Sequence, residues 1–390
     1  MKQVIVLIFI ASLFSGFPKT IHASDSPVVS SGSAILIDAN TGEVLFEKKA
    51  TEEMYPASLT KIATAIYAIE KGNLNDIVTI GSNPRKIEGT RVYLEEGERV
   101  SLRKLIQGLI INSGNDAGVA IAEHMDGSIK TFSKNLNSYL AGLGLKNTVF
   151  MNPHGLFNPD HVTTAEDLAA LTQYAMENQE FSEIFGTKEL EWKGAAWKTT
   201  LYTHHKLMRE LPYEGVIGGK TGYVDQSGHT LVTAAKRKEL SLIVVTLNAS
   251  SQERAYDDTK KLLDYGFNHY KTSSIAKGTS FKVNDGSYTA KKMIYFTQNT
   301  KENMNNSIIV GERMAVLNPS EKFLSAVQHG TITEKTKEKK DKEKNKETKN
   351  ESKEQDIGLH FGLVLILAIA FFVLVKIGIN KKQLQKDLIK

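Results

Sequence analysis

The 390-residue chain contains no cysteine, so disulfide bonds, metal–thiolate sites and thiol nucleophiles are all excluded. It also lacks a large excess of either charge, since 49 basic against 44 acidic residues give a formal net charge of +5. The basic residues of the C-terminal tail are mixed with acidic ones, so the sequence does not indicate a nucleic-acid partner. The length allows two or three domains with a large core.

The histidines lack the pattern of a metal site. His124, His154, His204 and His205 do not show the i, i+4 spacing with acidic partners that is typical of zinc peptidases. We therefore expect no metal and no other cofactor.

The two ends of the chain differ from its middle. Residues 1–23 combine a positively charged start, an apolar stretch and a small residue at Ala23, which predicts a secretory signal peptide. Residues 357–376 are almost entirely apolar and long enough to cross a bilayer as one helix. The basic tail at 377–390 is predicted to stay in the cytoplasm. We thus expect an exported protein, anchored in the cell membrane by a single span.

Three segments lie between these ends. Residues 24–272 form the predicted main body, and residues 273–330 are strand-rich, which predicts a small all-β domain. Residues 331–356 are a run of lysine, glutamate, threonine and asparagine with no apolar face, which predicts a charged, disordered stalk.

Within the main body, five strand-like runs are separated by turns. The first two are joined by Asn40-Thr-Gly42 in a predicted hairpin, and the others lie within 215–224, 229–235 and 240–247. Helical patterns occupy much of residues 101–179 and then 251–270. We predict an α/β (α+β) fold in which helices flank one five-stranded antiparallel sheet.

The stretch Tyr55-Pro-Ala-Ser-Leu-Thr-Lys61 leads into an apolar run that ends at Gly72, which predicts a buried helix. Ser58 and Lys61 are three residues apart, so both lie on one face of this helix. A serine hydroxyl needs a nearby base to attack at neutral pH, and a lysine on a buried helix must be paired or functional. Taken alone, Ser-x-x-Lys is also typical of a serine N-cap followed by a surface lysine.

Two more polar clusters follow. Ser113-Gly-Asn115 forms a turn between two apolar helices, and Lys220-Thr-Gly222 lies in a strand flanked by further glycines. Glycine inside a strand often marks the close approach of a backbone to a ligand. Each cluster has an ordinary structural interpretation, either as a turn or as a hairpin with a solvated lysine.

The order Ser-x-x-Lys, Ser-x-Asn, Lys-Thr-Gly, on helix, turn and strand, is the motif set of penicillin-binding proteins and β-lactamases. The chain resembles the serine D-Ala-D-Ala carboxypeptidases of peptidase family S11 from about Ser33 to Tyr270. Supporting phrases are Asn152-Pro-His-Gly-Leu156, Thr163-Thr-Ala-Glu-Asp-Leu168, Gly218-Gly-Lys-Thr-Gly-Tyr223 and Leu263-Asp-Tyr-Gly-Phe267. The resemblance implies a transpeptidase/β-lactamase-like fold and makes residues 24–272 the catalytic domain.

The resemblance also implies roles for individual residues. Ser58 would be the acylated nucleophile and Lys61 its base, while Ser113 and Lys220 would pass a proton to the leaving D-alanine. Substrate contacts would come from Asn115, Lys220, Thr221, Gly222, Tyr223 and, in the closing helix, Arg254. The backbone N–H groups of Ser58 and Tyr223 would form the oxyanion hole. Two lysines in one cleft should also depress each other's pKa.

The expected reaction is removal of the terminal D-alanine from peptidoglycan stem pentapeptides, which controls cross-linking and cell shape. The expected partners are stem peptides that end in D-Ala-D-Ala, with β-lactams as covalent inhibitors. The alternatives are a class A-like β-lactamase, a D,D-endopeptidase, or a non-catalytic wall-binding or penicillin-sensing module. A lactamase normally has a Glu-x-x-Leu-Asn deacylation element, and Glu166-Asp-Leu-Ala does not match it.

Overall fold

The structure, a computed structural model, describes residues 26–283, 286–290, 293–300, 306–310, 313–317, 323–326 and 332–334. The predicted signal peptide, membrane span and cytoplasmic tail lie outside these residues, as does the stalk apart from residues 332–334. The chain divides into two units, Met1–Thr333 and Glu334–Lys390, and the elements below belong to the first except for Glu334 at the end of the last strand. Among the described residues, no helix has the length and apolar character that a membrane span requires.

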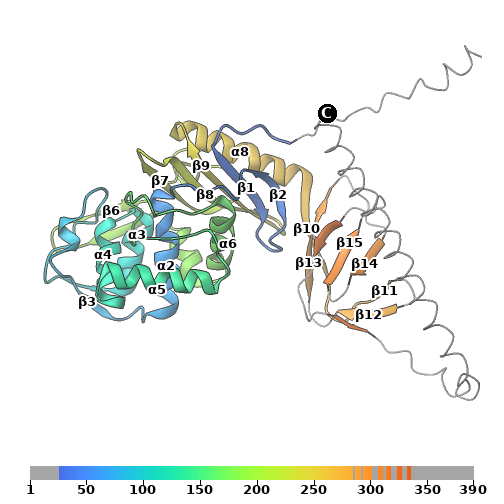
Figure 1. The fold of residues 1–390 in the computed structure, drawn as a ribbon, viewed down its shortest axis with the longest axis horizontal. Coiled ribbons are helices and arrows are strands. Elements are labelled where there is room, and N and C mark those ends of the chain that lie inside the picture. The colour runs from blue at the N-terminus through green and yellow to red at the C-terminus, as the bar shows by residue number, and fades with distance from the viewer. Residues whose placement is uncertain are drawn as a thin grey trace, which may run out of the picture. The chain divides into compact units, whose positions relative to one another are not determined.

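A five-stranded antiparallel sheet is the centre of the main body, as predicted (Figure 1). Its strand order is β2-β1-β9-β8-β7. The bounds are β1 Ser33–Asp38, β2 Val44–Lys48, β7 Val216–Val224, β8 Gly228–Arg237 and β9 Leu240–Ala249. The predicted hairpin between β1 and β2 is confirmed, and Gly42 takes the positive φ of +76° that its turn requires.

The two faces of the sheet belong to different cores because side chains alternate along a strand. Ile35 and Ile37 of β1 lie in the core that the sheet shares with the helical layer. Leu36, between them, packs in a second core with Leu262 and Leu263 of α8. Figure 1 shows α8 on one side of the sheet and α2 and α6 on the other.

α2, Thr60–Lys71, lies deep in the helical layer, with every residue from Thr60 to Ala68 buried. It ends at Gly72, as predicted. Around it lie α3 Leu102–Ile111, α4 Asn115–Asp126, α5 Ile129–Gly142, α6 Ala165–Met176 and α7 Gln179–Phe185. The closing helix is α8, Gln252–His269, capped by Ser251.

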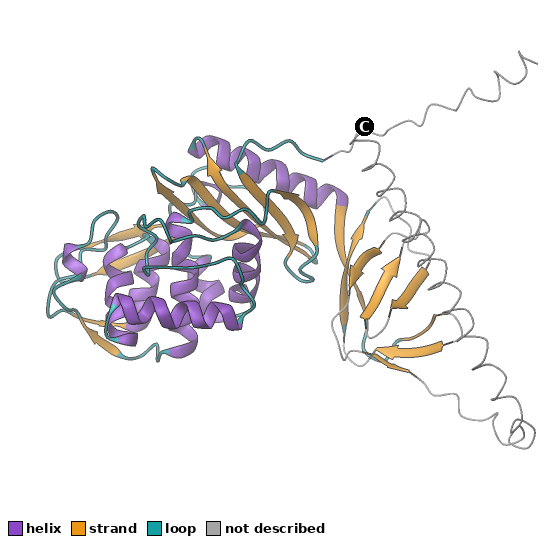
Figure 2. Cartoon of the chain, in the orientation of Figure 1, coloured by secondary structure: helices purple, strands orange, loops and turns teal. Residues whose placement is uncertain are grey.

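Two small two-stranded sheets were not predicted: β3 Ile77–Thr79 with β4 Arg99–Ser101, and β5 Glu189–Lys193 with β6 Lys198–Tyr202. After α8 the described residues are strands (Figure 2). These are β10 Tyr270–Ile275, β11 Ser280–Val283, β12 Gly286–Ala290, β13 Ile294–Asn299, β14 Asn306–Val310, β15 Arg313–Leu317, β16 Phe323–Ala326 and β17 Ile332–Glu334. The last strand lies beyond residue 330, where the small β-rich domain was predicted to end.

The N-terminal segment is tied to α8 by one carboxylate. Asp258 Oδ2 accepts hydrogen bonds from the backbone N–H and the hydroxyl of Ser30 and of Ser31, at 2.7–2.9 Å. The Asp258 side chain is almost wholly buried, at 1% exposure. Burial acts to raise its pKa, but these hydrogen bonds outweigh burial and hold the pKa below the ordinary value.

Asp258→Asn should lower the free energy of unfolding by about 1–3 kcal/mol at pH 7, because a buried hydrogen-bond network loses its charged acceptor. A depressed folded-state pKa stabilises the fold above the unfolded pKa of about 3.9, and this stability is lost as pH falls through the folded pKa. The difference between variant and parent should therefore shrink in urea unfolding below pH 4. Asp257→Asn is the matched control, because Asp257 is exposed and pairs with Lys260 at the surface, and it should change stability by less than about 0.5 kcal/mol. Equal effects of the two substitutions would contradict this role of Asp258.

Candidate active site

Ser58 lies in a short 3-10 helix, Ala57–Leu59, that leads directly into α2. The preceding residue, Ala57, has a φ of +48°, a conformation that costs energy for a residue with a side chain. Neighbouring groups hold this backbone in place. Thr60 Oγ1 donates to the Ala57 carbonyl at 2.9 Å, and Thr230 Oγ1 donates to the Pro56 carbonyl at 3.0 Å.

Lys61 Nζ lies 2.8 Å from Ser58 Oγ and donates a second hydrogen bond, of 2.7 Å, to the carbonyl of His154. The lysine is fully buried. Its pKa is lowered well below the ordinary value, mainly by burial and then by the charge of Lys220, while Asp116 opposes the shift. Burial and Lys220 thus favour the neutral form of the Lys61 amine, which lies within reach of the serine proton.

Ser113 lies in the turn between α3 and α4, at a φ of +61°. Its Oγ accepts a 3.0 Å hydrogen bond from Lys220 Nζ, which also donates to the Thr221 carbonyl at 2.9 Å. Burial lowers the pKa of Lys220 to about 7. The structure thus brings together the serine and lysine residues of all three sequence motifs, although the motifs are separated by up to 162 residues between Ser58 and Lys220.

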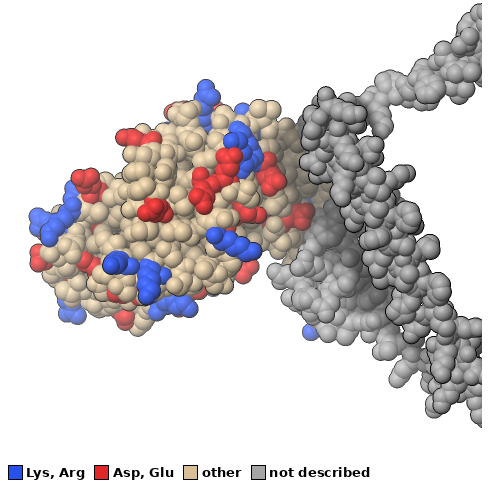
Figure 3. Space-filling view, in the orientation of Figure 1, with Lys and Arg blue, Asp and Glu red and all other residues tan. Residues whose placement is uncertain are grey.

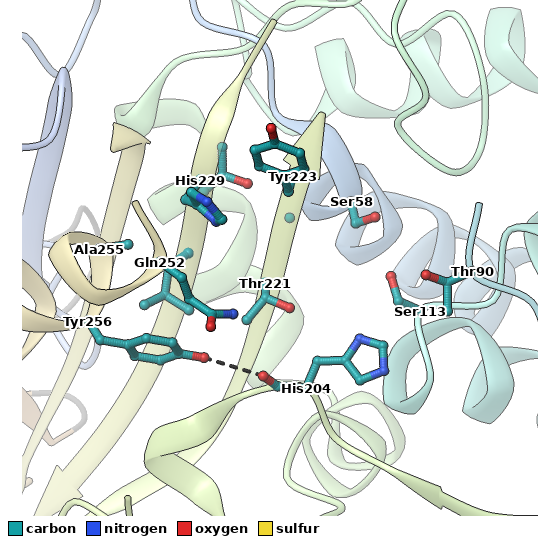
Figure 4. A pocket seen from close by; sticks show the side chains of 13 residues that line it. Ser58, Thr90, Ser113, His204, Thr221, Tyr223, His229, Gln252, Ala255 and Tyr256 are labelled. Atoms are coloured by element: carbon teal, nitrogen blue, oxygen red, sulfur yellow. Dashed lines mark hydrogen bonds between the residues drawn. The ribbon is translucent and has the colours of Figure 1, made fainter. Parts of the chain in front are cut away.

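A cavity of about 360 Å³ lies between these elements. Figure 4 shows Ser58, Ser113 and Thr90 on one side, facing Thr221 and Tyr223 of β7 on the other. The cavity lining consists of Ser58, Thr90, Ser113, His204, Thr221, Gly222, Tyr223, His229, Thr230, Leu231, Gln252, Ala255 and Tyr256. The described part of the chain contains no group of three or more histidine, cysteine, aspartate or glutamate side chains that could hold a metal ion.

Gly222 allows β7 to pass close to Ser58. A Cβ atom built on Gly222 would lie 2.4 Å from Thr230 Oγ1 and 2.8 Å from the backbone nitrogen of Ser58. Any side chain at this position would therefore push the strand away from the serine. This is the close backbone approach that a glycine inside a strand indicates.

Asn115 is near the site but does not line the cavity. Its backbone N–H donates to the Thr90 carbonyl, and its side-chain amide donates to the Glu88 carbonyl, both at 2.7 Å. Asp116 beside it accepts hydrogen bonds from Val92 and Leu94. These two residues hold the loop that carries Thr90 into the cavity.

Arg254, the predicted carboxylate contact, does not line the cavity either. Its side chain is exposed on α8, and its backbone N–H donates to Ser251 Oγ. The same helix contributes Gln252, Ala255 and Tyr256 to the wall instead.

Several lining residues were missed in the sequence: Thr90, His204, His229, Gln252 and Tyr256. They belong to none of the three motifs, and His204 was considered only as a metal ligand. Only folding brings them to the cavity. Tyr256, for example, donates its hydroxyl to the His204 carbonyl at 3.3 Å (Figure 4). The face drawn in Figure 3 carries basic and acidic side chains interspersed over the described body.

Residues 20–251 match the family model described as D-alanyl-D-alanine carboxypeptidase. The chain is 34% identical over 251 residues to D-alanyl-D-alanine carboxypeptidase DacF of Bacillus subtilis, a match that spans 63% of this chain and 64% of that protein. It is 32% identical over 283 residues to DacD of Escherichia coli, spanning 69% and 71%.

Solved structures give a similar result. Penicillin binding protein 5 from Haemophilus influenzae superposes with a TM-score of 0.68 at 25% identity, covering 79% of this chain and 97% of that one. Penicillin binding protein 6B from Escherichia coli superposes with a TM-score of 0.67 at 28% identity, covering 80% and 98%.

Gly155→Ala tests the backbone that holds Ser58. Gly155 has a φ of +87°, and a Cβ atom there would lie 1.9 Å from the Ala57 carbonyl oxygen. We expect covalent labelling by a fluorescent penicillin to slow by about 100-fold or more, because the turn that carries the serine must move. Gly144→Ala is the control. Gly144 has a φ of +90° with nothing near the added methyl group, so the variant should lose about 1–2 kcal/mol of stability but label normally. Equal labelling of both variants would show that Gly155 does not position the Ser58 turn.

Proposed function

Since the chain belongs to peptidase family S11, the D-alanyl-D-alanine carboxypeptidases, we propose that it hydrolyses the terminal D-Ala-D-Ala bond of peptidoglycan stem pentapeptides through an acyl-enzyme on Ser58. The single observation that carries this proposal is the contact between the buried Lys61 amine and Ser58 Oγ, at 2.8 Å. A neutral amine at that distance is a suitable general base for the hydroxyl.

In the acylation step, Lys61 takes the hydroxyl proton as Ser58 Oγ attacks the carbonyl carbon of the penultimate D-alanine. The C–N bond then breaks, and the leaving amine of the last D-alanine receives a proton by way of Ser113 and Lys220. The 3.0 Å hydrogen bond between those two residues supports this path. In deacylation, a water molecule attacks the ester while Lys61 takes its proton, and Lys61 returns that proton to Ser58 Oγ as the ester bond breaks.

Two backbone N–H groups, those of Ser58 and Tyr223, would stabilise the oxyanion. Gly222 supports this assignment, because its lack of a side chain lets β7 lie against the Ser58 backbone. β7 is the edge strand of its sheet, with β8 as its one partner, so part of its backbone is open to a substrate. An oxyanion hole of this kind contributes about 3–4 kcal/mol per donor in comparable enzymes.

The remaining motif residues would position the peptide. The Thr221 hydroxyl lines the cavity opposite Ser58 and would donate to the terminal carboxylate. Asn115 does not line the cavity, and its hydrogen bonds to the Glu88 and Thr90 carbonyls suggest a supporting role, in which it would hold the Thr90 loop against the peptide.

Slow deacylation after reaction with penicillin is expected, which separates the proposed carboxypeptidase from a β-lactamase. Glu166 is exposed in the first turn of α6, where the helix dipole favours its charge. Glu166 does not line the cavity, so it is not available there to activate a deacylating water.

The proposed site of action is outside the cell. We infer export by residues 1–23, anchoring by residues 357–376 and a cytoplasmic tail at 377–390, with residues 331–356 as the linking stalk. The sequence pattern of these segments supports this arrangement. It would place the enzyme at the membrane surface, where stem peptides are exposed.

The direct test is release of D-alanine from a stem pentapeptide by the full-length chain in mild detergent. We expect release by the parent protein and a loss of at least about a thousandfold in Ser58→Ala, because the acyl-enzyme cannot form. Ser138→Ala, a substitution on the exposed face of α5, is the matched control and should keep the parent rate. Release that survives in Ser58→Ala would refute the proposal.

A further inference from the structure

The cavity has no lysine or arginine among its lining residues, all of which lie in the described part of the chain. Lys220 is buried behind the wall, where its amine is bound to Ser113 and to the Thr221 carbonyl. Arg254 is exposed on α8 and outside the cavity. Yet a peptide that ends in D-Ala-D-Ala carries a carboxylate, and a partly buried carboxylate needs hydrogen-bond donors and a positive charge.

The groups suited to a carboxylate are gathered on one side of the cavity. Figure 4 shows His229, Gln252 and Thr221 together on the side opposite Ser58 and Ser113. They come from β8, the first turn of α8 and β7, respectively. The N-terminal end of α8 adds a helix dipole that favours a negative charge at this side.

His229 is held at this position by its neighbours. It is paired with Tyr223 across the β7–β8 ladder, and the two rings lie 4.6 Å apart at an angle of 35°. The imidazole is partly exposed, so it is accessible to a ligand in the cavity. Of the cavity-lining side chains, only the histidines His229 and His204 can gain a positive charge. Burial and the nearby Lys220 lower the pKa of His204 to about 4, so His229 is the candidate cation near neutral pH.

On the basis of the proposed function, we propose that His229, together with Gln252 and Thr221, binds the terminal carboxylate of the substrate, and that His229 takes up a proton when it does so. His229 would thus supply the positive charge that the cavity otherwise lacks. Selectivity for a free C-terminus over an amide-linked one would follow from the same contact.

The surroundings of His229 explain why the proton arrives with the ligand. Burial lowers its pKa below the ordinary value, and Glu253 in the first turn of α8 partly opposes that shift. The charge of Lys206 helps to lower the pKa of Glu253 and so keeps Glu253 ionised. Tyr223 on β7 donates its hydroxyl to Asp225. The free imidazole is therefore neutral at pH 7. A carboxylate beside it would raise the pKa by about 1–3 units, as for other close pairs of opposite charge.

Proton uptake makes substrate binding depend on pH. Between the pKa of the free protein and the higher pKa of the complex, affinity should rise by up to tenfold for each unit that the pH falls. A C-terminal amide carries no negative charge, so its affinity should not show this dependence.

The test is binding to Ser58→Ala, which cannot be acylated, measured calorimetrically from pH 5.5 to 8.5. The ligands are an N-acetylated stem peptide that ends in D-Ala-D-Ala and the same peptide as its C-terminal amide. We expect the acid to bind more tightly as pH falls and the amide to show little change. Adding His229→Gln should weaken binding of the acid by about tenfold or more at pH 6. It should also remove the pH dependence below pH 7, where Lys220, with a pKa of about 7, is already mostly charged.

Two substitutions are matched to His229→Gln. Arg254→Gln should leave binding of the acid within about twofold, because its side chain does not line the cavity. His229→Lys should restore binding of the acid without the pH dependence that His229 causes, because a partly exposed lysine keeps its charge over this range. The second result is not expected if His229 merely supports the fold.

Three outcomes would overturn the proposal. They are unchanged binding of the acid in His229→Gln, loss of acid binding in Arg254→Gln, or a pH dependence of acid binding that disappears in His204→Gln but not in His229→Gln.

Turnover separates this proposal from the function on which it rests. With Ser58 intact, His229→Gln should raise KM for release of D-alanine and leave kcat nearly unchanged. If the parent releases no D-alanine, the proposed function fails; if release is normal and KM does not respond to His229, only the carboxylate-binding role of His229 fails.

Discussion

The site depends on the burial of one amine. Lys61 is fully enclosed, and its Nζ donates hydrogen bonds to the Ser58 hydroxyl and the His154 carbonyl. A charged ammonium would be costly in this position, so burial favours the neutral form that accepts a proton. The apolar helix α2 is what makes this burial possible, because its residues from Thr60 to Ala68 are enclosed by the sheet and the surrounding helices.

The rest of the fold keeps the other groups in register with that amine. The strained backbone at Ala57 and Ser113 is supported by hydrogen bonds from Thr60 and by the α3–α4 turn, and Gly155 and Gly222 leave room for the Ser58 turn. Strained residues of this kind often occur at functional sites, where the surrounding structure maintains a geometry that the local sequence alone would not adopt. The sheet then provides Lys220 and Thr221 on a strand whose position β8 fixes.

Much of this fold could be predicted because alternation and helical periodicity carry the necessary information. The five strands of the central sheet and α8 were predicted from such patterns. Ser58 and Lys61 were recognisable as a pair because three-residue spacing on a helix fixes their proximity. His229 and Gln252 were not, because their presence in the cavity results from tertiary packing of β8 and α8. Arg254 was expected at the substrate on the basis of resemblance, but the helix directs Gln252, Ala255 and Tyr256 to the cavity instead.

The most direct measurement of the central claim is the pH dependence of the rate at which benzylpenicillin acylates the protein, followed by mass spectrometry of the Ser58 peptide. If burial keeps Lys61 neutral, the acylation rate should stop rising well before pH 10.5, the ordinary lysine pKa from which Lys61 is shifted. A rate that continued to rise tenfold per pH unit up to that value would mean that the amine beside Ser58 is charged at neutral pH. That result would contradict its role as the base.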